Sequence, residues 1–116
     1  MSEETVRLET EDTGEVLIIR VLNRRIKYEQ SAGLGDQLKE AASMFGGRNV
    51  LLDFENVEYM TSEALGKLVS LKKAMPAEGQ LKIVLTNKNI KEVFKITNFD
   101  RIIEVHKSVS AALKSF

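Results

Sequence analysis

The spacing of apolar and polar residues in the first half of the chain predicts two strands and a helix. Residues 6–10 (VRLET) alternate as in a half-buried strand, and residues 11–14 (EDTG) supply Asp and Gly for a hairpin turn. Residues 16–22 (VLIIRVL) are almost continuously apolar, which is typical of a strand buried on both faces. The polar stretch 23–31 is expected to be a loop. A helix with one apolar face is expected to follow and to end at Gly46–Gly47, which can form a left-handed cap. Its apolar residues are Leu34, Leu38, Ala41, Ala42 and Phe45.

The next segment predicts a central strand and a second helix. Residues 49–54 (NVLLDF) form a short apolar run, and residues 55–60 (ENVEYM) lead into the helix. Pro76 lies just past the last periodic residues and agrees with an end to the helix there. Glu63 and Lys67 are expected one turn apart on the solvent side. The apolar stripe consists of Ala64, Leu65, Leu68, Val69, Leu71 and Met75.

The remainder predicts a strand at 81–86, a helix at 87–96, a strand at 101–105 and a closing helix at 108–116. In the 87–96 helix, the residues expected to face inward are Ile90, Val93, Phe94 and Thr97. Strands that alternate with helices of this length imply crossover units. We therefore expect one α/β domain over residues 1–116, in the order β-β-α-β-α-β-α-β-α. Its sheet of four to five strands is expected to be mixed but mainly parallel, with the first strand at an edge and about four helices.

The amino-acid composition argues against several classes of function. Seventeen basic and seventeen acidic residues cancel, so no strong field attracts nucleic acid or an anionic membrane. The chain has no cysteine and one histidine, which disfavours disulfides, thiolate chemistry and His- or Cys-rich metal sites. The acidic N-terminus lacks the apolar core of a signal peptide, and no apolar stretch is long enough to span a membrane. We expect a soluble cytoplasmic protein without membrane insertion.

Two adjacent hydroxyls, Thr61 and Ser62, lie where the chain passes into the second helix. One interpretation is structural: either hydroxyl can cap the helix by accepting a backbone N–H bond. A nucleophilic serine is disfavoured, because His106 lies far along the chain and no G-x-S-x-G turn surrounds Ser62. A phosphate acceptor fits better, since a phosphate at a helix N-terminus meets free N–H groups and the positive end of the dipole. Its charge would switch off contact with a partner.

Other candidates surround this position. Gly66, one turn after Ser62, would let another backbone come close, whereas Glu63 would repel a phosphate. Arg24, Arg25 and Lys27 cluster in the predicted loop, where they either meet an acidic partner or keep an edge soluble. Lys88, Lys91 and Lys95 are expected to form a solvated helix face, and Asp53 is expected to bond nearby backbone N–H groups rather than a metal. The sequence has no glycine-rich phosphate loop, dinucleotide fingerprint or ligand cluster, so we expect no cofactor.

The stretch NVLLDFENVEYMTSEALGKLVSLKKA resembles the central signature of STAS domains, which occur in anti-sigma-factor antagonists and in the tails of sulfate transporters. In that family an apolar strand ending in Asp is followed by a loop, then Asp-Ser-x-Gly-Leu and a helix. The segment from Lys82 to Phe116 is similar to the family's closing strand-helix-strand-helix unit. Within it, Asn98 replaces a customary glycine, and asparagine tolerates the same left-handed turn. The resemblance covers nearly the whole chain.

The resemblance implies a role for Ser62, which matches the serine that a partner kinase phosphorylates in antagonists of this family. Asp53 matches the acidic residue that ends the preceding strand, and Gly66 and Leu65 match the helix start. Thr61 stands where Asp is usual, and it is a second, less favoured acceptor. Two further departures are Ala64, in place of a glycine, and Asn23–Arg24–Arg25, in place of gly-glu-leu.

The resemblance thus implies a non-enzymatic anti-sigma-factor antagonist, a bacterial partner-switching protein that regulates transcription. It would bind an anti-sigma factor that is a serine-protein kinase, and phosphorylation of Ser62 would break the contact. The expected contact residues are Asn23, Arg24, Arg25, Lys27, Thr61, Ser62, Glu63, Gly66 and Lys67. The alternative is an unphosphorylated STAS scaffold or a regulatory subunit of a transport ATPase or signalling complex, which Thr61 and Glu63 favour. Whether the protein forms a homodimer stays open.

Overall fold

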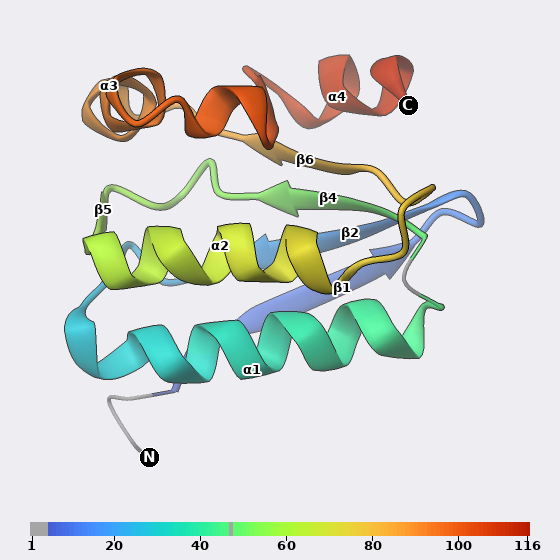
Figure 1. The fold of residues 1–116 in the computed structure, drawn as a ribbon, viewed down its shortest axis with the longest axis horizontal. Helices are drawn as coiled ribbons and strands as arrows, with labels where there is room; N and C mark the ends of the chain where they lie inside the picture. The colour runs from blue at the N-terminus through green and yellow to red at the C-terminus, as the bar shows by residue number, and fades with distance from the viewer. Residues whose placement is uncertain (1–4, 47) are drawn as a thin grey trace.

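The computed structural model describes residues 5–46 and 48–116 (Figure 1). The strands are β1 (Leu8–Asp12), β2 (Val16–Val21), β3 (Arg25–Ile26), β4 (Asn49–Asp53), β5 (Tyr59–Met60), β6 (Leu81–Val84) and β7 (Glu104–His106). The helices are α1 (Tyr28–Met44), α2 (Ser62–Ala74), α3 (Lys88–Ile96) and α4 (Val109–Ser115), and a 3₁₀ turn, η1, covers Phe99–Arg101.

The main sheet has five strands in the order β1-β2-β4-β6-β7. Strand β1 pairs with β2 antiparallel, and the other neighbours pair in parallel, so the predicted mixed sheet with the first strand at its edge is confirmed. The hairpin turn forms as expected: Asp12 Oδ1 accepts a bond from Gly14 N at 2.7 Å, and Gly14 has a φ of 94° that favours glycine. Gly46 takes the predicted left-handed conformation after α1, with a φ of 84°. Gly47, the other residue of that predicted cap, lies outside the described residues.

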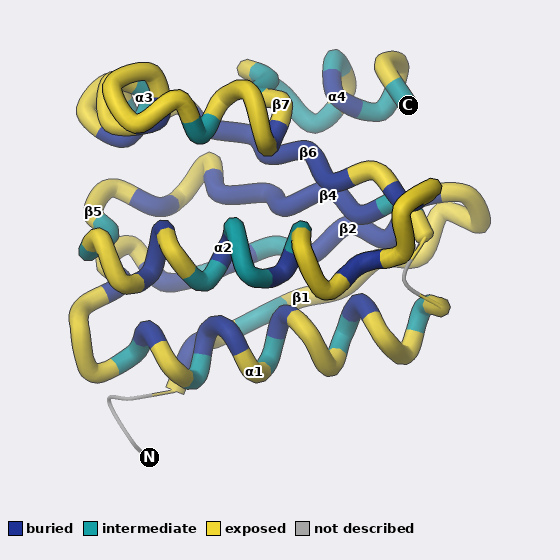
Figure 2. Tube along the Cα trace, viewed as in Figure 1, coloured by how far each residue is buried: buried dark blue, intermediate teal, exposed yellow. Residues whose placement is uncertain are grey.

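Two hydrophobic clusters hold helices on opposite faces of the sheet. The larger cluster joins Leu38 of α1, Leu68 of α2 and Phe94 of α3 to one face. The smaller cluster places Ala112 of α4 against Val84 and its neighbours on the other face. Figure 2 shows the consequence: β6 is buried along its length and β4 from Val50 onward, whereas the helices are buried on one side only.

The predicted loop at 23–31 is wrong over most of its length. Residues Arg25–Ile26 form β3, which pairs in parallel with β5, a strand that the sequence did not predict either. Helix α1 begins at Tyr28, three residues before the end of the predicted loop. Its first turn is closed locally, because Gln30 Oε1 accepts the backbone N–H of Lys27 at 2.9 Å.

The strand predicted at 101–105 is shifted. Residues Phe99–Arg101 form η1 and only Glu104–His106 pair with β6, because Ile102 N and Ile103 N bond to the carbonyl of Phe99. Asn98 precedes this turn with a φ of 61°, which confirms the left-handed conformation expected of it. In α3, Ile90 and Phe94 are buried as predicted, but Val93 is exposed, and so is Thr97, the C-cap residue that follows the helix.

Candidate functional site

The start of α2 separates the roles of the two adjacent hydroxyls. Thr61 is the N-cap residue, with φ −79° and ψ 166°, and its side chain accepts a hydrogen bond from Ala64 N at 3.2 Å. Ser62 is the first helical residue and is exposed. Thr61 therefore performs the capping for which either residue was a candidate. The Ser62 hydroxyl lies in solvent at the N-terminal end of a 13-residue helix.

The short sheet of β3 and β5 attaches the basic segment 24–27 to this helix start. Arg25 pairs with Tyr59 and Ile26 pairs with Met60. The ladder continues at both ends, since Arg24 O accepts from Glu58 N at 2.7 Å and Ile26 O accepts from Thr61 N at 3.2 Å. Residues far apart in the sequence therefore lie side by side, next to Ser62.

The three basic residues of this segment have different surroundings. Arg24 Nη2 donates to Glu58 Oε1 at 2.9 Å, and this bond raises the pKa of the Arg24 guanidinium above its ordinary value. Arg25 instead places its guanidinium carbon 4.7 Å from the ring centroid of Tyr59, a cation–π contact. Lys27 is exposed at the start of α1.

Three other predicted contact residues sit on or near α2. Glu63 is exposed beside Ser62, and Gly66 is exposed with nothing within 4 Å of where a Cβ would stand. Lys67 is half-buried, because its stem crosses α1 at Gly35, where an added Cβ would come within 2.9 Å of Lys67 Cδ. Gly35 was not among the residues predicted to matter here, although a glycine inside a helical pattern is a signal for close packing.

Asn23 does not face solvent with the others. It is 7% exposed, and its Oδ1 accepts the backbone N–H of Arg7 at 2.7 Å. The side chain thus helps hold the strand β1 region to the end of β2, which corrects the expectation that Asn23 contacts a partner directly.

Asp53, at the end of β4, is a buried ion-pair residue. It is 1% exposed, its Oδ1 accepts from Glu55 N at 3.2 Å, and its Oδ2 accepts from Arg20 Nε at 2.9 Å. The bond to Asp53 raises the pKa of Arg20. The predicted backbone bond is therefore confirmed, and the Arg20 partner is a further finding. Over residues 5–46 and 48–116, no group of three or more His, Asp or Glu side chains is arranged to hold a metal ion.

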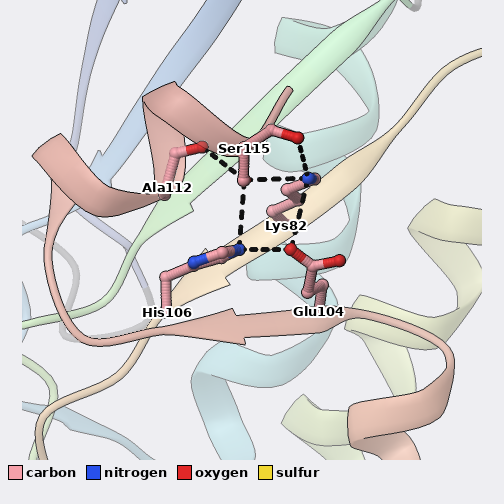
Figure 3. Close-up of polar contacts among 5 residues, drawn as sticks. All are labelled: Lys82, Glu104, His106, Ala112 and Ser115. Atoms are coloured by element: carbon pink, nitrogen blue, oxygen red, sulfur yellow. Dashed lines mark hydrogen bonds and ion pairs between the residues drawn. The ribbon is translucent and has the colours of Figure 1, made fainter.

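A second polar cluster holds α4 to the sheet (Figure 3). Lys82 Nζ on β6 donates to Ser115 O and Ser115 Oγ, both at 2.8 Å, and to Glu104 Oε1 at 3.2 Å. His106 Nε2 contacts Glu104 Oε1 at 2.5 Å and Ser115 Oγ at 3.2 Å. This cluster could not be predicted from the sequence, because a lysine inside a short apolar strand gives no sign of its partners.

This cluster does not have the arrangement of a nucleophilic site. Ser115 Oγ donates its proton to Ala112 O at 2.6 Å and accepts from Lys82, so that proton points at a backbone carbonyl rather than at His106 Nε2, which lies 3.2 Å away. The same nitrogen of His106 faces both Glu104 and Ser115, whereas a triad uses the two ring nitrogens separately. The residues therefore form a structural clamp on α4.

Fold and site together define a protein of the mixed α/β class with an exposed serine at a helix start, beside a short accessory sheet. Comparison with known proteins narrows that class. The family model for the STAS domain matches residues 7–112, and the chain belongs to the STAS domain family, as the sequence resemblance indicated.

The relatives and solved structures agree with this family. A Thermotoga neapolitana protein named as an anti-sigma factor antagonist homolog is 33% identical over 70 residues, which are 60% of this chain and 62% of that relative. The match thus spans less than two thirds of the relative's length. The crystal structure of an anti-sigma factor antagonist from Mycobacterium paratuberculosis has a TM-score of 0.86 at 16% identity, covering 98% of this chain and 96% of that one.

A further neighbour in fold is the Bacillus cell fate determinant SpoIIAA. Its phosphorylated form has a TM-score of 0.69 at 15% identity, covering 97% of this chain and 100% of that one. Its unphosphorylated form, an anti-sigma factor antagonist, gives the same TM-score and identity. At these identities the structures show a shared fold. Among the residues that our structure describes, no helix combines the length and apolar character needed to span a bilayer.

Proposed function

We propose that this protein is an anti-sigma factor antagonist that binds an anti-sigma kinase and is released when Ser62 is phosphorylated. The contact surface, which we call the Ser62 face, consists of Arg24, Arg25, Lys27, Thr61, Ser62, Glu63, Gly66 and Lys67. The family, and the names of the relatives within it, support the antagonist role. ATP belongs to the partner in this proposal, and the protein itself is a non-enzymatic switch that regulates transcription.

The observation that carries the proposal is the division of roles at the start of α2. Since Thr61 provides the cap, the Ser62 hydroxyl is exposed and its modification removes no capping bond. A phosphate on Ser62 would sit at the N-terminal end of α2, where backbone N–H groups and the helix dipole favour negative charge. It would also add up to about two negative charges to the Ser62 face, which is enough to repel a docked partner.

Because Ser62 does not cap the helix, it is favoured over Thr61 as the phosphate acceptor. Phosphorylating Thr61 would change an oxygen that already accepts the Ala64 N–H, so it would perturb the helix as well as the surface. Phosphorylating Ser62 changes the surface alone. Ser62 is therefore the proposed site.

The experiment is a binding and kinase assay with each anti-sigma factor of the host. Wild type and Ser62→Ala are expected to bind the cognate factor equally, and Ser62→Asp to bind at least about tenfold more weakly, a loss of about 1.4 kcal/mol. With ATP, wild type should gain about 80 Da by intact mass, the increment of one phosphate, and Ser62→Ala should not. Ser43→Asp, which places the same charge on an exposed position of α1, is the matched control.

The alternative is a constitutive STAS scaffold or a regulatory subunit of a transport ATPase or signalling complex. Glu63 favours it, because its exposed carboxylate lies next to Ser62 and opposes a phosphate there. If Ser62→Asp and Ser62→Ala bind every anti-sigma factor equally, the switch is refuted. Unmodified protein that copurifies with a membrane ATPase would then support the scaffold.

A further inference from the structure

A stacked arginine and two exposed tyrosines lie on or beside the Ser62 face. The guanidinium of Arg25 stacks on Tyr59, which is 42% exposed, and Tyr28, at the first residue of α1, is 68% exposed. The backbone beneath them is fixed, because β3 pairs with β5 and Ile26 is fully buried. Tyrosine and arginine, together with tryptophan, are enriched among the residues that dominate binding energy at protein interfaces.

Ion pairing distinguishes Arg25 from its neighbour. Arg24 is matched by Glu58 at 2.9 Å. Among the described residues, no carboxylate lies within ion-pair distance of Arg25. Glu29 and Glu63 are the acidic residues of the adjoining first turns of α1 and α2. Arg25 therefore carries a positive charge that has no ion-pair partner among the described residues.

We propose that Arg25, Tyr59 and Tyr28 form a receptor for an acidic segment of the partner protein, in which a partner carboxylate binds the guanidinium of Arg25. The contact with the Tyr59 ring restricts the Arg25 side chain, and a guanidinium can form two parallel bonds to one carboxylate. The tyrosine rings bury apolar surface around that pair. Lys27, exposed two residues beyond Arg25, supplies a second positive charge for the same segment.

This inference rests on the proposed function for its partner and explains the direction of the switch. The carbonyl of Ile26, next to Arg25, accepts the N–H of Thr61, which places the receptor beside Ser62. A phosphate on Ser62 would bring like charge against an acidic partner segment. The partner would then leave because its own carboxylates are repelled.

The test is an NMR titration of ¹⁵N-labelled protein with a synthetic acidic peptide of alternating Glu and Tyr, at low salt. This probe does not depend on any anti-sigma factor. The amides of Arg25, Tyr59 and Ser62 should shift most. Arg25→Gln should weaken binding about tenfold, the loss expected for a charged hydrogen-bonded pair. Arg25→Lys should recover only part of it, because an ammonium lacks the planar fork.

The chain offers a matched control. Arg48 stacks on Phe45 with the same 4.7 Å separation between guanidinium carbon and ring centroid, but it lies beyond the other end of α1. Arg48→Gln should change peptide binding less than about twofold. The receptor is refuted if the peptide fails to bind, if it shifts the Lys88–Lys95 region of α3 most, or if Arg48→Gln weakens binding as much as Arg25→Gln. A negative result in the anti-sigma binding assay would instead refute the proposed function and leave this titration standing.

Discussion

Replacing Lys82 by methionine should release α4 from the sheet. The Lys82 side chain is 7% exposed, and its ammonium donates to Glu104 and to two oxygens of Ser115. It also lies 4.8 Å from the ring centroid of Phe116. Methionine keeps the length and apolar character of the stem, so the substitution removes the charge and its bonds without leaving a large cavity.

The magnitude follows from the exposure of the partners. Glu104 is 57% exposed and Ser115 is also exposed, so water can take up their hydrogen bonds when the ammonium is gone. Each lost bond then costs about 0.5–1 kcal/mol rather than the larger penalty of a buried, unsatisfied group. Three bonds give a loss of about 1.5–3 kcal/mol in the free energy of unfolding. Because Glu104 is solvated, the bond from Lys82 to Glu104 contributes about 0.5 kcal/mol, the lower value of this range.

Urea denaturation measures the total, and hydrogen exchange measures where the loss occurs. The amides of α4 should exchange faster in Lys82→Met, while those of α1 and α2, which belong to the larger cluster, should keep their protection relative to global unfolding. Lys114→Met, which removes an exposed lysine from α4 itself, should change neither measurement. A Lys82→Met variant as stable as wild type with unchanged exchange in α4, or an equal effect of Lys114→Met, would contradict the prediction.

Three further predictions test the core, the cap and the clamp. Leu68→Ala should lower the free energy of unfolding by about 2–5 kcal/mol, since Leu68 is fully buried in the larger cluster; a loss below 1 kcal/mol in urea denaturation would contradict its core position. Thr61→Ala should cost about 1 kcal/mol and Ser62→Ala less, by the same measurement, because Thr61 holds the cap; the reverse order would show that Ser62 is structural. The pKa of Glu104 is lowered from its ordinary 4.5, first by the bond from His106 and then by Lys82, so the unfolded state binds a proton more readily. The stability this gives is present above pH 4.5 and is lost as the pH falls through the lower pKa of the folded state; Glu104→Gln should remove that component from the urea midpoint plotted against pH, and an unchanged profile would contradict it.

The elements that could be predicted from sequence are those whose hydrophobic pattern extends over several turns or fills a whole strand. In α2, the residues Ala64, Leu65, Leu68 and Leu71 are buried, as the stripe indicated. In β4, the apolar run from Val50 to Leu52 marks a central strand that is covered on both faces. In such segments the residue types themselves indicate which positions are buried, so a single sequence is enough to predict them.

The parts that could not be predicted depend on partners far away in the chain. Strands β3 and β5 have two residues each and form only because they pair with one another, which no local pattern records. Lys82 lies in a run otherwise apolar, and its burial is explained by Ser115, 33 residues later. At the other end of the molecule, Arg24 and Arg25 look equivalent in sequence, and only the positions of Glu58 and Tyr59 give them different surroundings.

A local contact, by contrast, explains how Thr61 can begin the helix at the position where the family resemblance places Asp. The position needs an acceptor oxygen for the N–H of Ala64, and a hydroxyl supplies it as a carboxylate would. What changes is charge: a threonine brings none, so the negative charge next to Ser62 comes from Glu63 on the following residue instead. Because Glu63 lies inside the first turn of α2, its carboxylate and a phosphate on Ser62 would draw on the same positive end of the helix. The proposed switch in this chain therefore starts from a Ser62 face that already carries one negative charge beside the acceptor. The loss of partner affinity on phosphorylation then depends on how much of the binding energy comes from the contact between the partner and Arg25.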